Sequence, residues 1–248
     1  MLLHPMNHMG IIFIGTGKYI RFFPRYYETV RERFLPSAQK TFFVFTDRLD
    51  APFVDSRSVK VYPTEHMEWP YVTLLRFRII NRAAPELAQT DAVVFLDADM
   101  FVNHLIAADE FMSHGKPLFG VAHPGYTRRG LLRRLLGKAK GTFETNEASL
   151  AAVKRSDDLS TYWQGCFWGG RTERTLQMVS ELERRVDDDL QRGVIAVWHD
   201  ESHLNKYFIE HRDEVHTFHP GYAYPELWSI PYPKMIVHIA KDNKSLHT

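Results

Sequence analysis

Short apolar runs alternate with helical patterns along the first hundred residues. Gly10–Ile14 and Thr41–Phe45 are compact β-rich runs, which are typical of strands buried on both faces. Residues 20–34 repeat apolar side chains at helical spacing, and residues 58–62 alternate as a third strand. A helix is expected from about Thr73 to Leu87, with Arg76 pointing away from its apolar stripe. This order predicts an α/β nucleotide-binding half.

The longest apolar run, Ala92–Val102, is interrupted only by Asp97 and Asp99. It predicts a central parallel strand, and ligands of open α/β sheets bind beyond the carboxyl ends of such strands. Two carboxylates one residue apart repel each other unless a cation lies between them. Carboxylate oxygens suit Mg²⁺ or Mn²⁺, and such an ion can also take diphosphate oxygens. The pattern alone leaves a solvated acidic turn open.

The second half of the chain continues with strands and one long helix. Residues 117–122 predict a strand, residues 176–190 an amphipathic helix that ends near Gly193, and residues 235–239 a last strand. Tyr162–Gly170 mixes aromatic residues with glycines. That mixture suits either a concave wall against which a sugar ring lies or a strand in the core.

A second group of polar residues follows the long helix. Trp198, His199, Asp200, Glu201 and His203 come directly after an apolar run, and such groups are costly to bury unless they are paired or take part in function. The two histidines are spaced to share a metal, but the remainder of a zincin signature is missing. We therefore expect capping and hydrogen-bonding roles for both imidazoles.

Composition narrows the class of protein. The chain has 248 residues, of which 44% are hydrophobic and 25% charged, so one large domain is expected. A net charge of +1 gives no global field that would attract nucleic acid. The single cysteine, Cys166, excludes an internal disulfide framework and fits a reducing compartment. Residues 1–10 leave no room for a signal peptide or spanning helix, so we expect a soluble cytoplasmic protein or a truncated piece of a longer one.

Residues 127–142 form a basic stretch bounded by glycines, with arginines and lysines around four leucines. The pattern suits an anionic surface, and a peripheral membrane contact is one interpretation. The other interpretation is a solvated loop with a helical turn.

Taken together, the motifs resemble glycosyltransferase family six, which contains the ABO histo-blood-group transferases, the α-1,3-galactosyltransferases and bacterial relatives. The most specific motif is Trp198–Tyr207, which resembles the family signature W-H-D-E-S-x-x-N-K-Y. Supporting motifs occur in the family's order: Thr16–Tyr19, Val44–Asp47, Asp97–Asp99, His123–Tyr126 and Tyr162–Gly170. The resemblance spans nearly the whole chain.

The resemblance implies a GT-A fold, which is a single α/β domain around a central mixed sheet. Residues 1–102 would form a Rossmann-like UDP-binding half, and residues 103–248 the acceptor-binding half and C-terminal tail. The implied reaction is retaining transfer of galactose or N-acetylgalactosamine from a UDP-sugar to the 3-hydroxyl of a galactoside, which could be lipid-linked. The implied cofactor is Mn²⁺ or Mg²⁺.

The resemblance also assigns residues to roles. Asp97 and Asp99 match metal and diphosphate ligands, Glu201 the acid that faces the anomeric carbon, and Asp200 a residue that binds the donor sugar. Acceptor-contacting positions fall on His123, Trp198 and Tyr224. Donor-binding positions fall on Ile14, Gly15, Thr16, Tyr19, Val72, Arg76, Ala98, Gln164, Gly165, Cys166, His199, Lys241 and Lys244.

Departures from the family refine these expectations. Bacterial relatives often replace the acidic pair with asparagines, whereas this chain keeps both aspartates, which favours metal dependence. Cys166 occupies the position that faces the C2 substituent of the donor sugar, and a side chain larger than glycine favours UDP-galactose, unless the thiol turns into the core. Pro225 replaces an acceptor-binding aspartate, so acceptor identity does not transfer. A hydrolase and a sugar-nucleotide or glycan-binding module on the same fold remain as alternatives.

Overall fold

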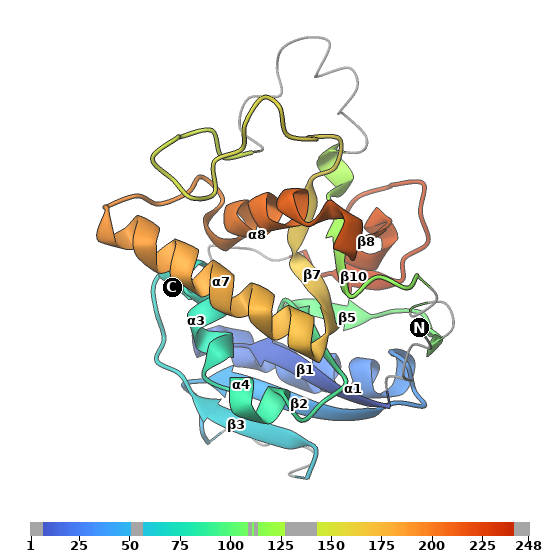
Figure 1. Cartoon of the computed structure of the whole chain (residues 1–248). Coiled ribbons are helices and arrows are strands. Elements are labelled where there is room, and N and C mark those ends of the chain that lie inside the picture. The colour runs from blue at the N-terminus through green and yellow to red at the C-terminus, as the bar shows by residue number, and fades with distance from the viewer. Residues whose placement is uncertain (1–6, 51–56, 109–110, 112–113, 127–142, 241–248) are drawn as a thin grey trace.

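A seven-stranded mixed sheet forms the centre of the molecule (Figure 1). The computed structural model describes residues 7–50, 57–108, 111, 114–126 and 143–240. The strands lie in the order β3 (Val59–Pro63), β2 (Gln39–Thr46), β1 (His8–Ile14), β4 (Ala92–Leu96), β7 (Trp163–Arg171), β6 (Leu118–Ala122) and β8 (Val215–Phe218).

The direction of the strands changes at β7. Strands β3, β2, β1 and β4 are mutually parallel, whereas β7 runs antiparallel to both β4 and β6. The carboxyl ends of β1 and β4 therefore lie at the same edge of the sheet as the beginning of β7. Leu96, the last residue of β4, is opposite Phe167. Ligands of open α/β sheets bind at such a change in strand order.

A three-stranded sheet adjoins this edge and consists of β5 (Met100–Val102), β10 (Ile236–His238) and β9 (Tyr224–Pro225). It explains why the long apolar run splits in two. The chain turns at Asp97, where the Met100 N–H donates to the Asp97 carbonyl at 3.1 Å, and then enters the second sheet. The register places His238 opposite Met100, beside the acidic pair.

Helices cover both faces of the large sheet. On one face, α1 (Phe23–Arg33) follows the 3-10 helix η1 (Gly17–Phe22), with Pro24 in its first turn, where the missing N–H costs nothing. The other face carries α7 (Thr172–Gln191) and α8 (His199–Glu210). Alternate residues of β1 divide accordingly: Ile11 packs in the core on the α1 side, and Ile12 in the core on the α7 side.

The expected helix over residues 73–87 is wrong as one continuous element. The structure has three short helices instead: α2 (Tyr71–Leu74), α3 (Arg76–Asn81) and α4 (Ala84–Leu87). Leu75 and Ala83 leave helical geometry between them. Pro85 has no N–H and would interrupt a longer helix, so it is accommodated in the first turn of α4. The first break places Arg76 at the start of a new helix, from which its side chain reaches Asp97 at the sheet edge.

The other expected elements are confirmed with small shifts of their ends, and so is the mixed α/β class. The 3-10 helices η2 (Arg212–Glu214) and η3 (Pro220–Ala223) flank β8.

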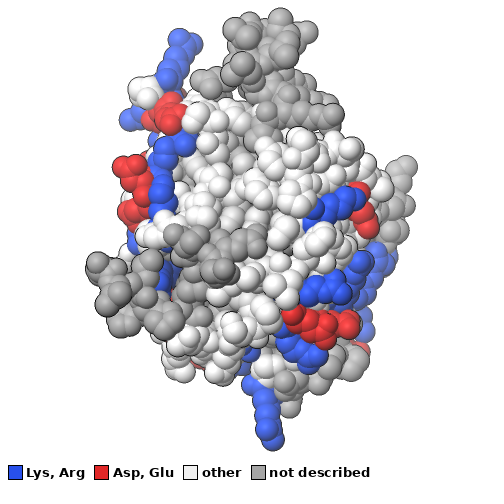
Figure 2. Space-filling model, turned by 90° about the vertical axis from the view of Figure 1, so that its right-hand side faces the viewer, with Lys and Arg blue, Asp and Glu red and all other residues white. Residues whose placement is uncertain are grey.

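Figure 2 shows a face on which basic and acidic groups lie near the margins, with uncharged surface between them. None of the described helices is both long and apolar enough to cross a membrane.

Candidate active site

The first turn of α8 presents two acids at the sheet edge. His199 has a φ of 50°, a conformation that non-glycine residues rarely adopt, and it sets the direction in which the helix begins. Asp200 and Glu201 follow it directly, and the Trp198 N–H donates to Ser202 Oγ at 3.0 Å. Within the described residues, the start of α8 has no side-chain capping hydrogen bond, so the expectation that His199 caps this helix is wrong. Its ring packs edge-on against that of Trp69, with ring centroids 4.9 Å apart.

Glu201 is held from two sides by β7 and the residue before it. The Tyr162 hydroxyl donates to Oε1 at 2.6 Å, and the Gly165 N–H donates to Oε2 at 2.7 Å. A Cβ at Gly165 would lie 3.2 Å from the Cβ of Glu201, so only glycine fits this approach without displacement. Burial raises the pKa of Glu201, and the two hydrogen bonds oppose that rise. The carboxylate is therefore fixed in position and poorly solvated.

Arg76 links the two acidic segments. Its guanidinium contacts Asp97 Oδ1 at 3.0 Å and Asp200 Oδ2 at 2.7 Å, and it also donates to the Gly165 carbonyl at 2.7 Å. The group lies 4.4 Å above the ring of Phe95 and is 7% exposed, which is low for an arginine. Burial raises the pKa of Asp200 to about 7, against the opposing effect of Arg76. One buried cation thus joins α3, β4, β7 and α8.

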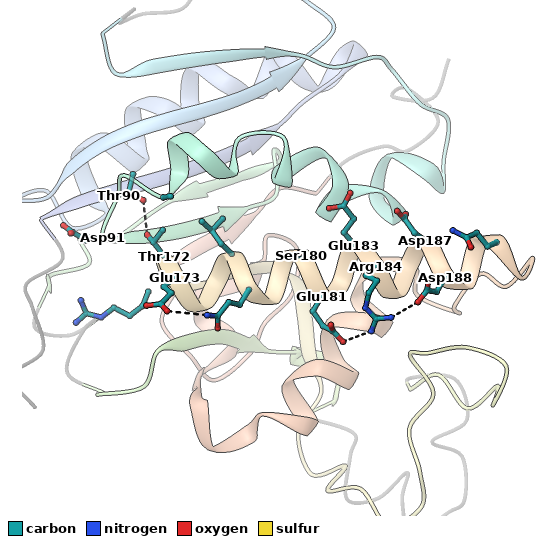
Figure 3. Close-up of a pocket in the computed structure, with 15 residues that line it drawn as sticks. Thr90, Asp91, Thr172, Glu173, Ser180, Glu181, Glu183, Arg184, Asp187 and Asp188 are labelled. Carbon is teal, nitrogen blue, oxygen red and sulfur yellow. Dashed lines mark hydrogen bonds and ion pairs between the residues drawn. The ribbon is translucent and has the colours of Figure 1, made fainter.

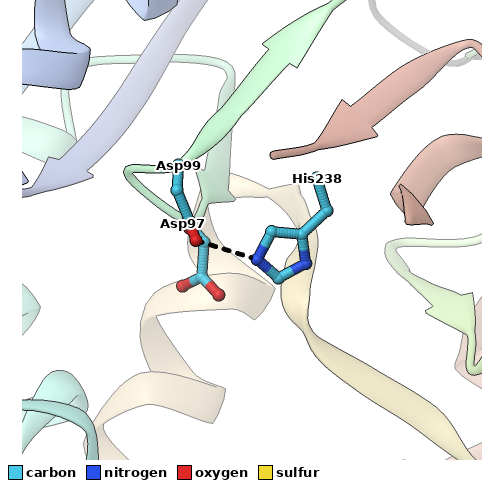
Figure 4. Close-up of side chains that lie close together, drawn as sticks. All are labelled: Asp97, Asp99 and His238. Carbon is cyan, nitrogen blue, oxygen red and sulfur yellow. Dashed lines mark hydrogen bonds and ion pairs between the residues drawn. The ribbon is translucent and has the colours of Figure 1, made fainter. Parts of the chain in front are cut away.

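Asp97, Asp99 and His238 form the one group of candidate metal ligands found among the described residues (Figure 4). Their ligand atoms all lie within 4.8 Å of one another, and His238 Nε2 is 3.1 Å from Asp99 Oδ2. Asp99 is almost fully buried, and a buried carboxylate needs a partner of opposite charge or several donors. Carboxylate and imidazole ligands suit a divalent ion of the Mn²⁺ class, so these residues fit the expected metal.

The loops after β1, β2 and β3 meet beside the acidic pair. Ile14 ends β1, and the Gly15 N–H donates to the Phe45 carbonyl at 2.9 Å. Thr16 Oγ1 lies 2.9 Å from His66 Nδ1, and the Gly17 N–H donates to Asp47 at 2.7 Å. These bonds shape the segment for which the resemblance implies a uridine pocket. Tyr19 lies in η1 and Val72 in α2, both half-buried.

Cys166 and Gln164 lie on β7 and contrast in their surroundings. Cys166 is 2% exposed and packs in the same core cluster as Ala98, as the alternative to a donor-facing thiol predicted. Burial raises the pKa of the Cys166 thiol, and neighbouring Asp97 and Glu201 add to the rise. Gln164 Oε1 is buried and has no hydrogen-bond partner in the described part of the chain. A buried unpaired carbonyl at a site edge points to a ligand donor.

The residues expected to contact an acceptor differ in their exposure to solvent. Trp198 is 49% exposed, and burial lowers the pKa of His123, whose ring lies 5.7 Å from that of Tyr162. Tyr224 is buried, and its hydroxyl accepts a hydrogen bond from the Ile230 N–H at 3.1 Å. The acceptor role of Tyr224 stays a prediction. The neighbouring Trp228 is 47% exposed.

His203 is the second imidazole of the signature. Its side chain is fully buried, and its Nε2 is 3.5 Å from Asp189 Oδ2 on α7. Neither ring nitrogen makes a hydrogen bond within the described residues, so the expected hydrogen-bonding role is not seen. His203 packs against Asp189 on α7 and the His199 ring packs against Trp69, so the two imidazoles do not face a common site.

Some site residues were missed from the sequence. His238 lies in the short apolar strand β10, and no motif in the sequence around it indicates a functional role. Glu144 is buried and accepts the Val197 N–H at 2.6 Å, so it fixes the segment before α8. The expected donor-binding residues Lys241 and Lys244, and the basic stretch 127–142, lie outside the described residues.

A groove of about 1300 Å³ runs along the outer face of α7 and is separate from this site (Figure 3). Its wall carries charged pairs, among them Arg184 with Glu181 and with Asp188. Thr90 and Thr172 hydrogen bond at one end. None of the acids or aromatic groups described above lines it.

Known proteins resemble this chain along most of its length. The sequence profile described as Glycosyltransferase family 6 matches residues 5–247. The O-antigen biosynthesis glycosyltransferase WbnI of Escherichia coli is 32% identical over 200 residues, which cover 81% of each chain. Histo-blood group ABO system transferase 2 of Rattus norvegicus is 29% identical over 82% of this chain and 60% of its own length. Globoside alpha-1,3-N-acetylgalactosaminyltransferase 1 of Mus musculus is 24% identical over 91% of this chain and 63% of its own length.

Proposed function

The chain belongs to glycosyltransferase family 6, and we propose that it moves galactose, or N-acetylgalactosamine, from a UDP-sugar to the 3-hydroxyl of a galactoside with retention of configuration. The class of glycosyltransferase follows from the family. The donor, the α-1,3 linkage and metal dependence are the proposal. They are supported by a relative whose name states an alpha-1,3-N-acetylgalactosaminyltransferase and by the acidic site at the sheet edge.

The position of Glu201 is the observation that carries the proposal. Tyr162 and Gly165 hold both carboxylate oxygens, while Arg76 and Asp200 lie on the adjacent side. Retention requires either a double displacement or attack from the face of the leaving group, and a fixed carboxylate under the anomeric carbon stabilises positive charge in both. A protein that only bound glycans would have no use for a poorly solvated acid at this place.

The nucleotide end of the donor is assigned to the loops after β1 and β2. Ile14, Gly15, Thr16 and Tyr19 would contact uridine, with Val72 from α2 on the other side. Asp97, Asp99 and His238 would hold the metal. When bound, the ion supplies positive charge to the diphosphate as UDP departs. Arg76 orients Asp97 and Asp200, so both acids face the donor in one geometry.

Donor choice is assigned to β7. Cys166 underlies the site, and Gln164 offers an unpaired carbonyl oxygen to a hydroxyl or amide of the sugar. Although the thiol packs in the core, it occupies more volume beneath the site than a glycine hydrogen would, and we propose that this volume gives a preference for UDP-galactose. For the acceptor, His123 and Trp198 offer an imidazole and an exposed indole. A lipid-linked acceptor, membrane contact through residues 127–142 and cytoplasmic location stay predictions from the sequence.

The proposal is tested by mixing the protein with UDP-galactose, a galactoside acceptor and Mn²⁺ and measuring UDP and glycan product. We expect stoichiometric UDP and disaccharide, and no turnover in excess chelator. UDP with free galactose would indicate a hydrolase, and tight donor binding without UDP release would indicate a binding module. Full turnover in excess chelator would contradict the metal assignment alone.

A further inference from the structure

We propose that His238 is a direct metal ligand beside Asp97 and Asp99, and that its nitrogen makes the site favour Mn²⁺ over Mg²⁺. The inference rests on the proposed metal-dependent transfer and deepens it. It concerns which ion the site selects and which residue selects it.

The backbone positions His238 before any ligand binds. Strands β5 and β10 pair antiparallel, with His238 opposite Met100, and the Ile239 N–H donates to the Asp99 carbonyl at 2.9 Å. Asp99 directly precedes β5 and His238 ends β10, so the pairing of these strands fixes the imidazole beside the Asp99 carboxylate. Such preorganisation in paired strands is what a metal site requires.

The distances match shared coordination. Two ligand atoms that lie about 2.2 Å from one ion at right angles are about 3.1 Å apart. His238 Nε2 and Asp99 Oδ2 are separated by 3.1 Å. Ligand atoms on opposite sides of the same ion are about 4.4 Å apart, and the whole set lies within 4.8 Å. The atoms therefore need only small movements to share one ion.

The other acids near the cluster are already paired, so a cation bound there would need a third protein ligand. Arg76 already occupies Asp97 Oδ1 at 3.0 Å, so Asp97 has one oxygen left for a cation. Glu226, which directly follows β9, already accepts the Ala240 N–H at 2.8 Å. Asp200 is paired with Arg76. Among these side chains, His238 is the group that can complete a set of three protein ligands.

A nitrogen ligand changes the preferred ion. Mg²⁺ binds oxygen ligands and retains its waters, whereas imidazole favours first-row transition ions. An aspartate pair without the histidine would discriminate little between Mg²⁺ and Mn²⁺. The alternative is that His238 only donates a hydrogen bond to Asp99 and orients it. The two roles differ in whether nitrogen lies in the coordination sphere.

The test is electron spin resonance of Mn²⁺ added to the protein in the presence of UDP, for the parent, His238→Ala and the control His104→Ala. His104 is exposed and contacts the Lys234 carbonyl at 2.7 Å, so it lies outside the cluster. We expect ¹⁴N modulation from a bound imidazole in the parent and in His104→Ala, and its loss in His238→Ala. Competition with Mg²⁺ should show about tenfold weaker Mn²⁺ binding in His238→Ala with little change for Mg²⁺.

Bound Mn²⁺ without ¹⁴N modulation in the parent would overturn the inference, as would equal losses of Mn²⁺ and Mg²⁺ in His238→Ala. Because His238→Ala could unfold β10, His238→Gln provides a second variant that keeps a polar side chain and removes the imidazole nitrogen. It should lose the modulation as well. Turnover of UDP-galactose is measured separately, so a transferase whose ion lacks nitrogen coordination would disprove this inference and leave the proposed function standing.

Discussion

Two clusters of buried polar residues lie on the same pair of helices, and they differ in how completely their carboxylates are paired. On α7, Asp189 accepts hydrogen bonds from Ser149 Oγ at 2.6 Å and the Leu150 N–H at 2.9 Å, pairs with Arg192 and lies beside His203. On α8, Asp200 pairs with Arg76, and Glu201 accepts hydrogen bonds from Tyr162 and Gly165.

The difference separates a structural cluster from a functional one. Asp189 accepts hydrogen bonds from Ser149 and Leu150 and pairs with Arg192, so it joins the loop before β7 to α7, and removing its charge should affect folding. On α8, Asp200 is buried and Glu201 is half-buried, both are incompletely neutralised, and burial raises the pKa values of both. An acid whose charge is costly in the free protein is suited to stabilise positive charge on a bound substrate.

The largest effect is expected from Glu201→Gln, which keeps the shape of the side chain and removes its charge. We expect kcat to fall by about 10²-fold or more, because the oxocarbenium-like charge loses its nearest anion. The free energy of unfolding should change little, since the lost charge was poorly solvated. Steady-state kinetics and urea unfolding measure the two effects, and near-parental kcat in a folded variant would refute the assignment.

Asp189→Asn is the matched acid-to-amide change in the other cluster. It should lower the free energy of unfolding by about 3 kcal/mol, because buried donors lose their charged partner. The kcat of the folded protein should stay within about twofold of the parent. A large loss of kcat at full folding would show that the α7 cluster also contributes to catalysis.

A smaller effect is expected at Cys166, which lies under the site between the core and the acids. Cys166→Gly should shift the ratio of kcat/KM values for UDP-galactose and UDP-N-acetylgalactosamine by about tenfold towards the acetamido sugar. Cys166→Ala, which leaves a smaller cavity, controls for loss of packing. A parent that already prefers the acetamido sugar, or a ratio unchanged in Cys166→Gly, would show that the thiol only fills the core.

The smallest effect concerns pH, where the two clusters have opposite signs. Burial lowers the pKa of His203 to about 4, so the unfolded chain binds more protons between pH 6.5 and 4 and stability falls as the pH falls through that window. Asp200, whose pKa rises from 3.8 to about 7, contributes stability that is present at acid pH and is lost progressively as the pH rises from about 4 to 7.

Urea unfolding of the parent from pH 4 to 8 measures the sum of these two opposing contributions. His203→Met should remove the His203 contribution between pH 6.5 and 4, so that stability falls less steeply with falling pH, and should leave the pH dependence above pH 6.5 unchanged. A variant with the same acid-side slope as the parent would show that His203 does not titrate as its burial requires.

The sequence predicted the fold better than it predicted the contacts. Continuous apolar runs identified the strands β1, β2 and β4, because strands buried on both faces have little choice of residue. The break at Leu75 was missed, since helical periodicity continues across it and only the path of Arg76 to the sheet edge explains it.

The site was predicted unevenly for the same reason. Asp97, Asp99 and Glu201 stand in recognisable motifs at element ends, where side chains converge. His238 comes from a strand far along the chain, and its approach to Asp99 depends on the pairing of β5 with β10, which no local pattern indicates. Long-range strand pairing of this kind is visible only once the chain is folded.

The most direct measurement of the central claim is the anomeric configuration of the product. The protein is incubated with UDP-galactose, Mn²⁺ and a galactoside, and the configuration of the new glycosidic linkage, which does not mutarotate, is read by proton NMR. The acidic site built around Glu201 predicts an α-linked galactose on the 3-hydroxyl, with release of UDP. A β-linked product, or free galactose in place of a disaccharide, would contradict it.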